Sequence, residues 1–279
     1  MSYVRALVAS AWAGWQRDFG WTNPIAGLSL KTIGPIASVL TASTVYWLGS
    51  SAARSFDPTN LAYILVGAAL YAHVAAYSWV PSLAITEGKW SNVFTQVYIS
   101  PKSSPPYLAG RCLASFATSA ITSGGSLVGA SVISIYLFNT GLPFVLTPVS
   151  IGLLVVALVV NIFASMGLGF LLSAYTIFAT KFEWALPVYV SGLLMVFSGA
   201  LFPVTLLPWP VSAVADVLPF TEFIRAARVA LIAGYPGSFW YYLGLSFVGG
   251  LVFLVLGLAA YAAAEHRARR LGVVDRKAV

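Results

Sequence analysis

Charged residues are scarce in this sequence. Asp, Glu, Lys and Arg make up 8% of its 279 residues, whereas a typical soluble domain carries about 25%. Hydrophobic residues make up 59%. A charged side chain at the centre of a membrane helix costs about 2.5 to 3.5 kcal/mol on the insertion scale. The deficit of charge therefore excludes an ordinary soluble domain and indicates an integral membrane protein.

Motifs for catalysis, metal binding and nucleotide binding are also missing. The single cysteine, Cys112, excludes an intrachain disulfide, and the two histidines, His73 and His266, lie far apart in the sequence. Neither HExxH nor GxSxG occurs, which argues against an intramembrane enzyme. Because there is no GxxxxGK[ST] loop, we expect no ATPase site and no cofactor or metal on this chain. No basic cluster is interleaved with aromatic residues, so we expect no nucleic-acid partner.

Long intervals without any charged residue are what the sequence does contain. A membrane-spanning helix needs about 20 apolar residues, and each interval is long enough for one. The longest can hold two, separated by a Gly- and Pro-containing turn at 139–143. The sequence therefore predicts six spans. The uncharged intervals are 32–53, 58–86, 112–180, 184–215 and 229–264.

The basic residues predict the orientation. With six spans and a cytoplasmic N-terminus, all of the 15 Lys and Arg residues except Arg54, Arg225 and Arg228 fall on the cytoplasmic side. We therefore expect a multi-pass protein of the plasma membrane with both termini in the cytoplasm. The lipid bilayer is its first expected partner.

The chain divides into one transmembrane domain with flanking segments. Residues 1–31 are predicted to form an interfacial helix and linker, because six apolar residues follow a helical spacing there. They are Val4, Leu7, Val8, Ala11, Trp12 and Trp15. Spans one to five are expected within 32–202, at about 33–51, 61–83, 113–138, 148–178 and 184–202. The last span is expected within 235–264, at about 239–263, and a cytoplasmic tail at 265–279.

Segment 203–234 is apolar but is interrupted by four prolines and contains four charged residues. If it crossed the membrane, the basic C-terminus would lie outside. We therefore expect a pair of re-entrant helices that dip into the outer leaflet and return. Glu222 and Arg225 have the i,i+3 spacing of a helical ion pair. Together with Asp216 and Arg228, we expect them to form an outer gate or to bind an anionic headgroup. The alternative is that their salt bridges only stabilise these helices.

A second unusual segment, 87–111, lies on the expected cytoplasmic side between spans two and three. Its apolar residues follow an i, i+3, i+4, i+7, i+8 spacing, and Pro101, Pro105 and Pro106 end the pattern. The stripe consists of Trp90, Val93, Phe94, Val97 and Tyr98. It predicts a short helix on the membrane surface, which is either an interfacial anchor or a docking element for a cytoplasmic partner.

Two polar residues fall inside predicted spans. His73 lies near the middle of the second span, and Asn161 lies within the fourth. Polar groups in hydrocarbon must find partners. Each residue is therefore a candidate either for lining a substrate path or for a hydrogen bond between helices.

The order of these features resembles that of permease subunits of the type-2 ABC exporter family. The resemblance rests on the short cytoplasmic helix, with Glu87-Gly88 before it and Ser100-Pro101 after it, and on the late segment that precedes the last span. In that segment Leu218-Pro219-Phe220-Thr221-Glu222 is similar to the Leu-Pro and Asn-Pro-Leu-Thr-Tyr tracts of the family. This chain has Leu-Pro-Phe where Asn-Pro-Leu is usual. The stretch around the short helix is also longer and richer in proline.

The resemblance implies a division of labour between subunits. Two permease chains would associate, as a homodimer or a heterodimer, and separate ATP-binding subunits would hold ATP and Mg²⁺. Closure of these subunits would drive export of a hydrophobic, drug-like or lipid-linked substrate. A secondary carrier or a non-transporting scaffold is the alternative, although no acidic residue lies well inside a predicted span, where ion coupling would require one. The residues expected to contact the ATPase are Glu87, Gly88, Trp90, Val93, Phe94, Val97, Tyr98, Ser100 and Pro101.

Overall fold

The computed structural model describes residues 3–19, 23–91, 93–99, 104–139, 144–179, 182–183 and 185–273. This part of the chain contains ten α-helices, one short 3₁₀ helix and no strand. The elements are α1 (Tyr3–Phe19), α2 (Pro24–Ala52), α3 (Pro58–Trp90), α4 (Val93–Ile99), α5 (Pro105–Phe138), α6 (Pro148–Thr176), α7 (Ala185–Phe197), η1 (Val204–Leu206), α8 (Val211–Val217), α9 (Pro219–Leu231) and α10 (Phe239–Leu271).

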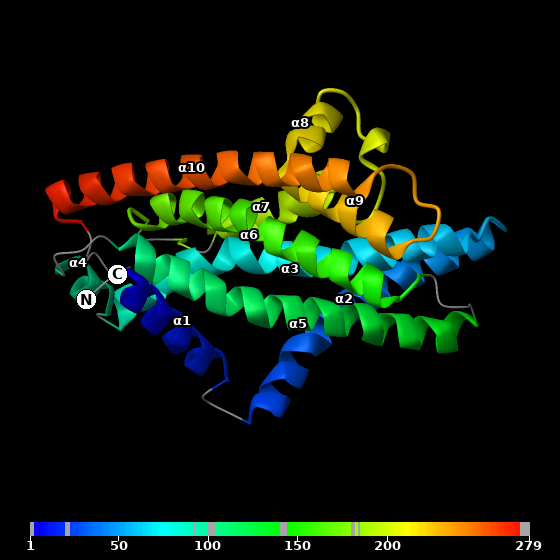
Figure 1. Ribbon diagram of the computed structural model, residues 1–279, viewed down its shortest axis with the longest axis horizontal. Helices are drawn as coiled ribbons and strands as arrows, with labels where there is room; N and C mark the ends of the chain where they lie inside the picture. The colour runs from blue at the N-terminus through cyan, green and yellow to red at the C-terminus, as the bar shows by residue number, and fades with distance from the viewer. Residues whose placement is uncertain are drawn as a thin grey trace.

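Five of these helices, α2, α3, α5, α6 and α10, are long and apolar enough to cross a membrane (Figure 1). This finding confirms the predicted class, an all-helical multi-pass protein. The fifth predicted span corresponds to α7, which is apolar but has only 13 residues. Such a helix is about 20 Å long, whereas the hydrocarbon core is about 30 Å thick. By length alone, the described helices provide five spans.

Proline marks the first turn of several helices. The ring fixes φ near its helical value, and the missing N–H would have no partner in the first turn anyway. In α3 the preceding residue completes the start, because the Asp57 side chain accepts a hydrogen bond from the Thr59 amide at 2.8 Å. For the same reason Pro105 and Pro106 begin α5 in the structure, rather than only ending the preceding stripe. The helices that start in this way are α2, α3, α5, α6 and α9.

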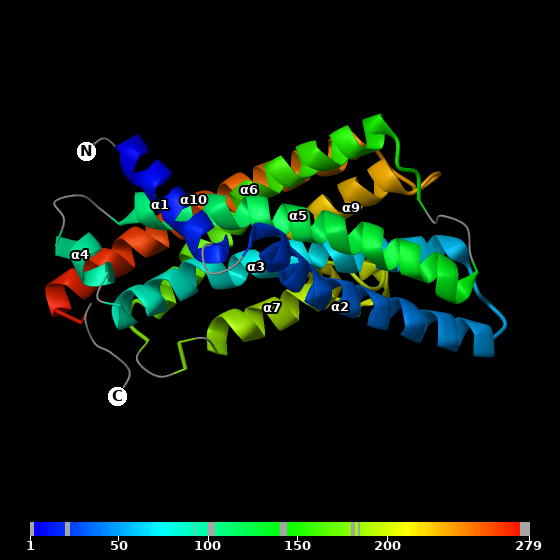
Figure 2. The ribbon, with the colours of Figure 1, turned by 90° about the horizontal axis from the view of Figure 1, so that it is seen from below.

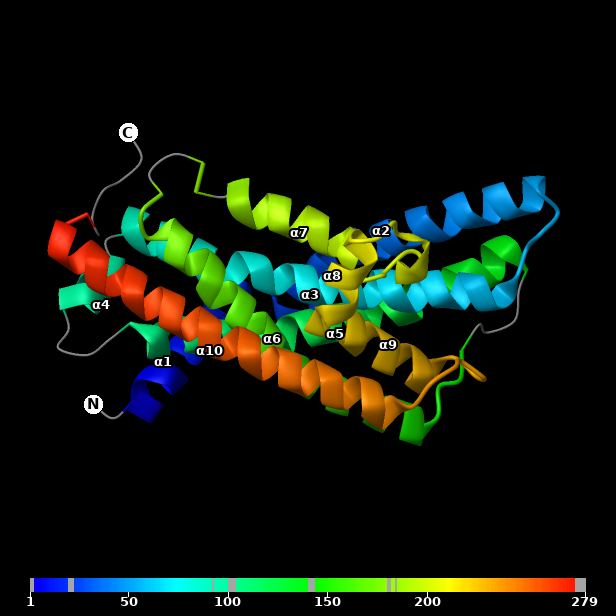
Figure 3. The same ribbon diagram turned by 90° about the horizontal axis from the view of Figure 1, so that it is seen from above.

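The helices form an elongated bundle in which glycines allow close contact. Helices α6 and α10 lie side by side along much of their length (Figures 1 and 3). A Cβ atom at Gly257 would overlap the carbonyl group of Gly167, so the two backbones touch there. Helix α1 crosses α5 in a similar way, because a Cβ atom at Gly110 would overlap the backbone of Leu7. The face of α1 turned away from the bundle carries exposed Val4, Val8 and Trp12.

The bundle has two distinct ends. Helices α1 and α4, the start of α5 and the last turns of α10 lie at one end, which we call the α4 end (Figure 2). At the opposite end, α2 turns into α3 and α10 begins. Helices α8 and α9 lie away from the α4 end, before α10 (Figure 1). The described part of the chain therefore starts and finishes at the same end of the bundle.

Candidate functional site

The last turn of α3 and the short helix α4 form a bend at the α4 end. We call residues 87–91 and 93–99 the elbow. One continuous helix was predicted from Trp90 onward, but in the structure Trp90 is the last residue of α3, and α4 begins at Val93. Ser91 is the C-cap residue of α3, and its amide and its hydroxyl both donate to the Glu87 carbonyl oxygen, at 2.9 and 2.8 Å. Ser100 and Pro101 lie outside the described residues, as does the side chain of Tyr98.

Phe94 attaches the elbow to the bundle. Its side chain is 0% exposed and lies in a cluster with Ile85, Leu108, Phe170 and Tyr261. Gly88 provides the space for it, because a Cβ atom at Gly88 would lie 2.8 Å from the Phe94 Cβ. Phe94 is therefore a packing residue inside the chain.

The outer face of the elbow is apolar and accessible. Trp90 is 57% exposed and Val93 is 42% exposed, Gln96 is also exposed, and Val97 is partly buried. The predicted stripe is thus divided between two faces, one that packs on the bundle and one that is available to a partner. Trp90 and Val93 are the large side chains on the second face.

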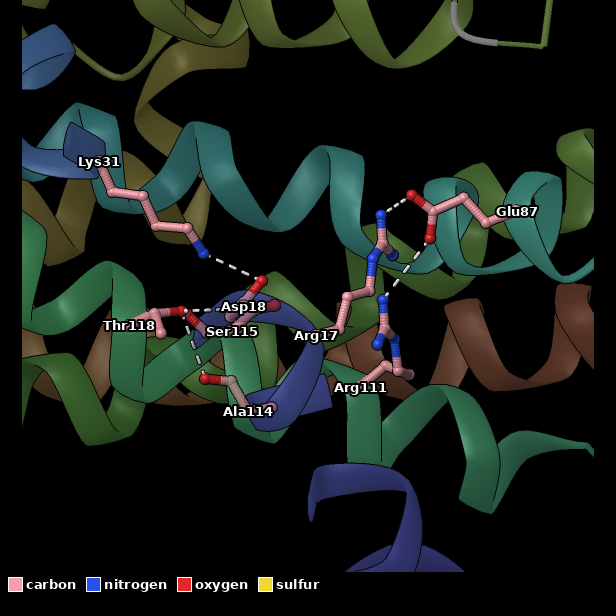
Figure 4. A network of polar contacts seen from close by, with 8 residues as sticks. All are labelled: Arg17, Asp18, Lys31, Glu87, Arg111, Ala114, Ser115 and Thr118. Carbon is pink, nitrogen blue, oxygen red and sulfur yellow. Dashed lines mark hydrogen bonds and ion pairs between the residues drawn. The ribbon is translucent and has the colours of Figure 1, made fainter. Parts of the chain in front are cut away.

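Glu87 connects the elbow to two other helices (Figure 4). It forms an ion pair with Arg17 of α1 and a second with Arg111 of α5, in which the Arg111 Nη2 to Glu87 Oε2 distance is 3.7 Å. Burial and the positive charge of Arg111 lower the pKa of Arg17. A carboxylate shared by two guanidinium groups holds α1, α3 and α5 in a fixed relation.

The neighbouring network in Figure 4 extends to α2. The Lys31 Nζ atom lies 3.0 Å from Asp18 Oδ1, and the Thr118 hydroxyl donates to Asp18 Oδ2 at 3.3 Å. Asp18 is the next residue after Arg17. The end of α1 is therefore bound to α2, α3 and α5 together.

Lys89 connects the elbow to α6. Its side chain is almost completely buried, and Nζ donates to the carbonyl oxygens of Thr176, Ile177 and Ala179 at 2.9, 3.1 and 3.2 Å. The last carbonyl groups of a helix have no partner within the helix and carry partial negative charge. Lys89 is thus a C-terminal cap supplied by another helix. Sequence reasoning did not assign this role, and the available signal was a lysine shortly after the second predicted span.

Glu265 connects the start of α5 to α10. The Ser104 hydroxyl donates to Glu265 Oε2 at 2.9 Å, and Arg269 Nη2 donates to Glu265 Oε1 at 2.8 Å. The Ser104 hydroxyl also lies 2.7 Å from that of Tyr261. Sequence reasoning did not identify this cluster. The elbow and the helix that follows it are therefore bound to α1, α5, α6 and α10 by buried or partly buried polar contacts.

The four charged residues of the predicted outer gate form two separate groups. Arg225 contacts Asp216 and Glu222, each at 2.6 Å, so the i,i+3 pair forms as expected. Arg228, also on α9, is buried and instead donates to the carbonyl oxygens of Tyr63, Gly199 and Ala200. The guanidinium of Arg228 is charged at neutral pH, because arginine stays protonated in proteins. A gating role for these residues stays a prediction.

The two polar residues predicted within the spans are both fully buried. His73 Nδ1 lies 2.9 Å from the Ser119 hydroxyl and so connects α3 with α5. Asn161 donates to the Ser165 hydroxyl at 3.1 Å, within α6. Neither side chain lines open space in this conformation, and a role in a substrate path stays a prediction.

An apolar groove of about 560 Å³ lies between α2, α3 and α7. Its wall includes Thr41, Val45 and Tyr46 of α2, Ile64 of α3 and Met195 of α7. Helix α2 contributes little to the core, since only 11% of its most apolar window is buried. The groove is therefore open along one side of the bundle.

No model of a known protein family matches the chain, and no curated protein matches it. The function must therefore be inferred from the geometry of the elbow and from the resemblance in sequence.

Proposed function

We propose that this chain is the transmembrane permease subunit of an ATP-driven exporter of the type-2 ABC class. The two different faces of the elbow support this proposal. Its outer face presents Trp90 and Val93, while Phe94 on the opposite face is buried in the bundle. A short helix with one accessible apolar face and one anchored face is suited to receive a partner and to transmit its movement.

The polar contacts of the elbow give this movement several routes. Displacement of α4 would act on α1 and α5 through Glu87 and on the end of α6 through Lys89. The start of α5 would carry it to α10 through Ser104 and Glu265. Buried charge-assisted hydrogen bonds are stronger and more directional than neutral ones. The helices at the α4 end would therefore move with the elbow rather than slide past it.

In the proposed topology the α4 end faces the cytoplasm and the chain crosses the membrane six times. The basic residues support this orientation, because Arg17, Lys89 and Arg111 lie at the α4 end. Helix α7 with the turn that follows it would form the fifth crossing. Helices α8 and α9 would be the re-entrant pair at the outer side, with their irregular backbone covered by neighbouring helices.

The proposed assembly contains two permease chains and two ATP-binding subunits, which hold ATP and Mg²⁺. The groove between α2, α3 and α7 is apolar and has a volume of about 560 Å³. Ligand sites typically have volumes of about 300 to 1,000 Å³. A hydrophobic or lipid-linked substrate fits such a surface better than a highly charged one. For export across the plasma membrane, movement of the elbow would have to change the width of this groove.

The proposal predicts a specific partner. The tagged chain, isolated from its native host in mild detergent, is expected to retain an ATP-binding-cassette subunit in near-stoichiometric amount, identified by mass spectrometry. If the chain is intact and monodisperse but repeatedly retains no such subunit, the permease function is contradicted. A secondary carrier or a scaffold would then account better for the fold.

A further inference from the structure

A polar cavity of about 300 Å³ lies near the end of the bundle opposite α4. Its walls come from α3, the turn after α7, α9 and the start of α10, and we call it the Arg228 cavity. Its volume is at the lower limit for ligand sites, so it suits a small group rather than a whole lipid. Its polar lining includes Tyr63, Ser198, Thr205, Arg228, Tyr235 and Tyr242.

Arg228 brings a positive charge to this cavity without a carboxylate to offset it. The residue is 1% exposed, and its guanidinium donates hydrogen bonds to the carbonyl oxygens of Tyr63, Gly199 and Ala200. Its guanidinium also lies over the Tyr63 ring, with Cζ 3.2 Å from the ring centroid. Carbonyl dipoles and an aromatic face stabilise a cation but carry no net charge. A buried charge without a counter-charge is costly, which indicates that an anion is accommodated nearby.

Two hydrogen-bonding groups at the same cavity have no partner among the described residues. They are Arg228 Nε and Ser198 Oγ, and both atoms are buried. Buried polar atoms are hydrogen-bonded in the large majority of cases. Two such groups on one cavity wall suit an acceptor with more than one oxygen atom.

The surrounding charges are compatible with an anion. Arg225 also lines the cavity, while its two partners, Asp216 and Glu222, are not among the lining residues. Within the described structure, the wall therefore carries two guanidinium groups and no carboxylate. The hydroxyl groups of Thr205, Tyr235 and Tyr242 add further potential donors.

We propose that the Arg228 cavity binds a phosphate group, either in the headgroup of a phospholipid or as free phosphate. Guanidinium and hydroxyl donors match the geometry of phosphate oxygens. Exposed Trp240 and Tyr241 at the start of α10 are typical of the level at which phospholipid headgroups lie. The site does not depend on an ATP-binding subunit, so it can be tested on the isolated chain.

The experiment measures binding to the full chain in mild detergent. Native mass spectrometry counts retained phosphatidylglycerol, phosphatidylcholine and diacylglycerol, the last of which has the acyl chains but no phosphate. In parallel, the thermal midpoint is recorded with inorganic phosphate against sodium chloride at equal ionic strength. We expect retention of phosphate-bearing lipid over diacylglycerol, or a raised midpoint with inorganic phosphate.

Ser198→Ala tests the site better than a change at Arg228 would. Arg228→Lys would also remove the hydrogen bonds to Gly199 and Ala200 that hold the turn after α7. Removing a buried hydroxyl that has no partner leaves the empty protein as stable as before or more stable. The same change removes one hydrogen bond to a bound phosphate, so binding should weaken about tenfold. Ser173→Ala is the matched control, since Ser173 is also buried with an unpartnered hydroxyl, within α6. That variant should bind as the wild type does.

The outcomes separate the two sources of phosphate. If Ser198→Ala loses phospholipid retention but not the effect of inorganic phosphate, the ligand is a phospholipid headgroup. If it loses the effect of inorganic phosphate but not phospholipid retention, the ligand is free phosphate. The proposal is overturned if diacylglycerol is retained as well as phospholipid while inorganic phosphate has no effect. It is also overturned if Ser198→Ala and Ser173→Ala bind phosphate equally well.

Discussion

Replacing Trp90 and Val93 together by glutamate is expected to leave the chain folded but to separate it from its ATP-binding subunit. Both side chains lie on the accessible face of the elbow. Glutamate there loses apolar contact and places charge against the partner, and a buried aromatic anchor at an interface is worth about 2 to 4 kcal/mol. We therefore expect at least about 30-fold weaker association, measured by quantitative co-purification, with ATP hydrolysis no longer coupled to the permease.

The matched control places the same charge away from the α4 end. Leu206 and Trp209 are 72% and 83% exposed and belong to the segment between α7 and α8. Leu206→Glu with Trp209→Glu should retain the ATP-binding subunit as the wild type does. Wild-type association of the Trp90 and Val93 variant, at normal folded yield, would exclude this face as the docking surface.

Phe94→Ala is expected to act on folding rather than on docking alone. The side chain is completely buried beneath α4, and truncation of a buried phenylalanine costs about 3 to 5 kcal/mol, including the cavity that remains. We expect a lower thermal midpoint and a reduced monodisperse yield in detergent. Tyr189→Ala, at a residue of α7 that is 70% exposed, should change neither.

Gly88→Ala tests the same contact from the other side. The added methyl group would lie 2.8 Å from the Phe94 Cβ, so α4 must shift and the thermal midpoint should fall, as for other overpacked sites. Gly124→Ala in α5 is the control, because a Cβ atom there meets nothing within 4 Å. Equal thermal midpoints for Gly88→Ala and Gly124→Ala would contradict the close contact between Gly88 and Phe94 of α4.

The elbow illustrates what the sequence could predict. The helical spacing of Trp90, Val93, Phe94 and Val97 predicted a short helix, and α4 is present at Val93–Ile99. Spacing alone could not decide which residues face inward, because the bundle, the bilayer and a protein partner all accept apolar side chains. The absence of a side chain at Gly88 was the local sign that another residue packs closely there.

Contacts between distant residues were beyond the sequence. Lys89 donates a hydrogen bond to the Thr176 carbonyl oxygen, and the Ser104 hydroxyl donates one to Glu265. Only the packing of whole helices brings these pairs together. Charge gaps located the long helices well, since a charge is costly in hydrocarbon. They did not give the length of α7, because its uncharged interval continues past Phe197 into a turn. An interval free of charge limits a span but does not require one continuous helix.

The proposed contact between the outer face of the elbow and an ATP-binding subunit can be tested by site-specific photo-crosslinking. A photoreactive amino acid at Val93, activated in membranes of the native host, is predicted to form a cross-link to an ATP-binding-cassette protein, identified by mass spectrometry. The same group at Trp209, which is exposed in the segment between α7 and α8, should form no such product. No cross-link to an ATP-binding protein from Val93, or an equal yield from both positions, would contradict this contact.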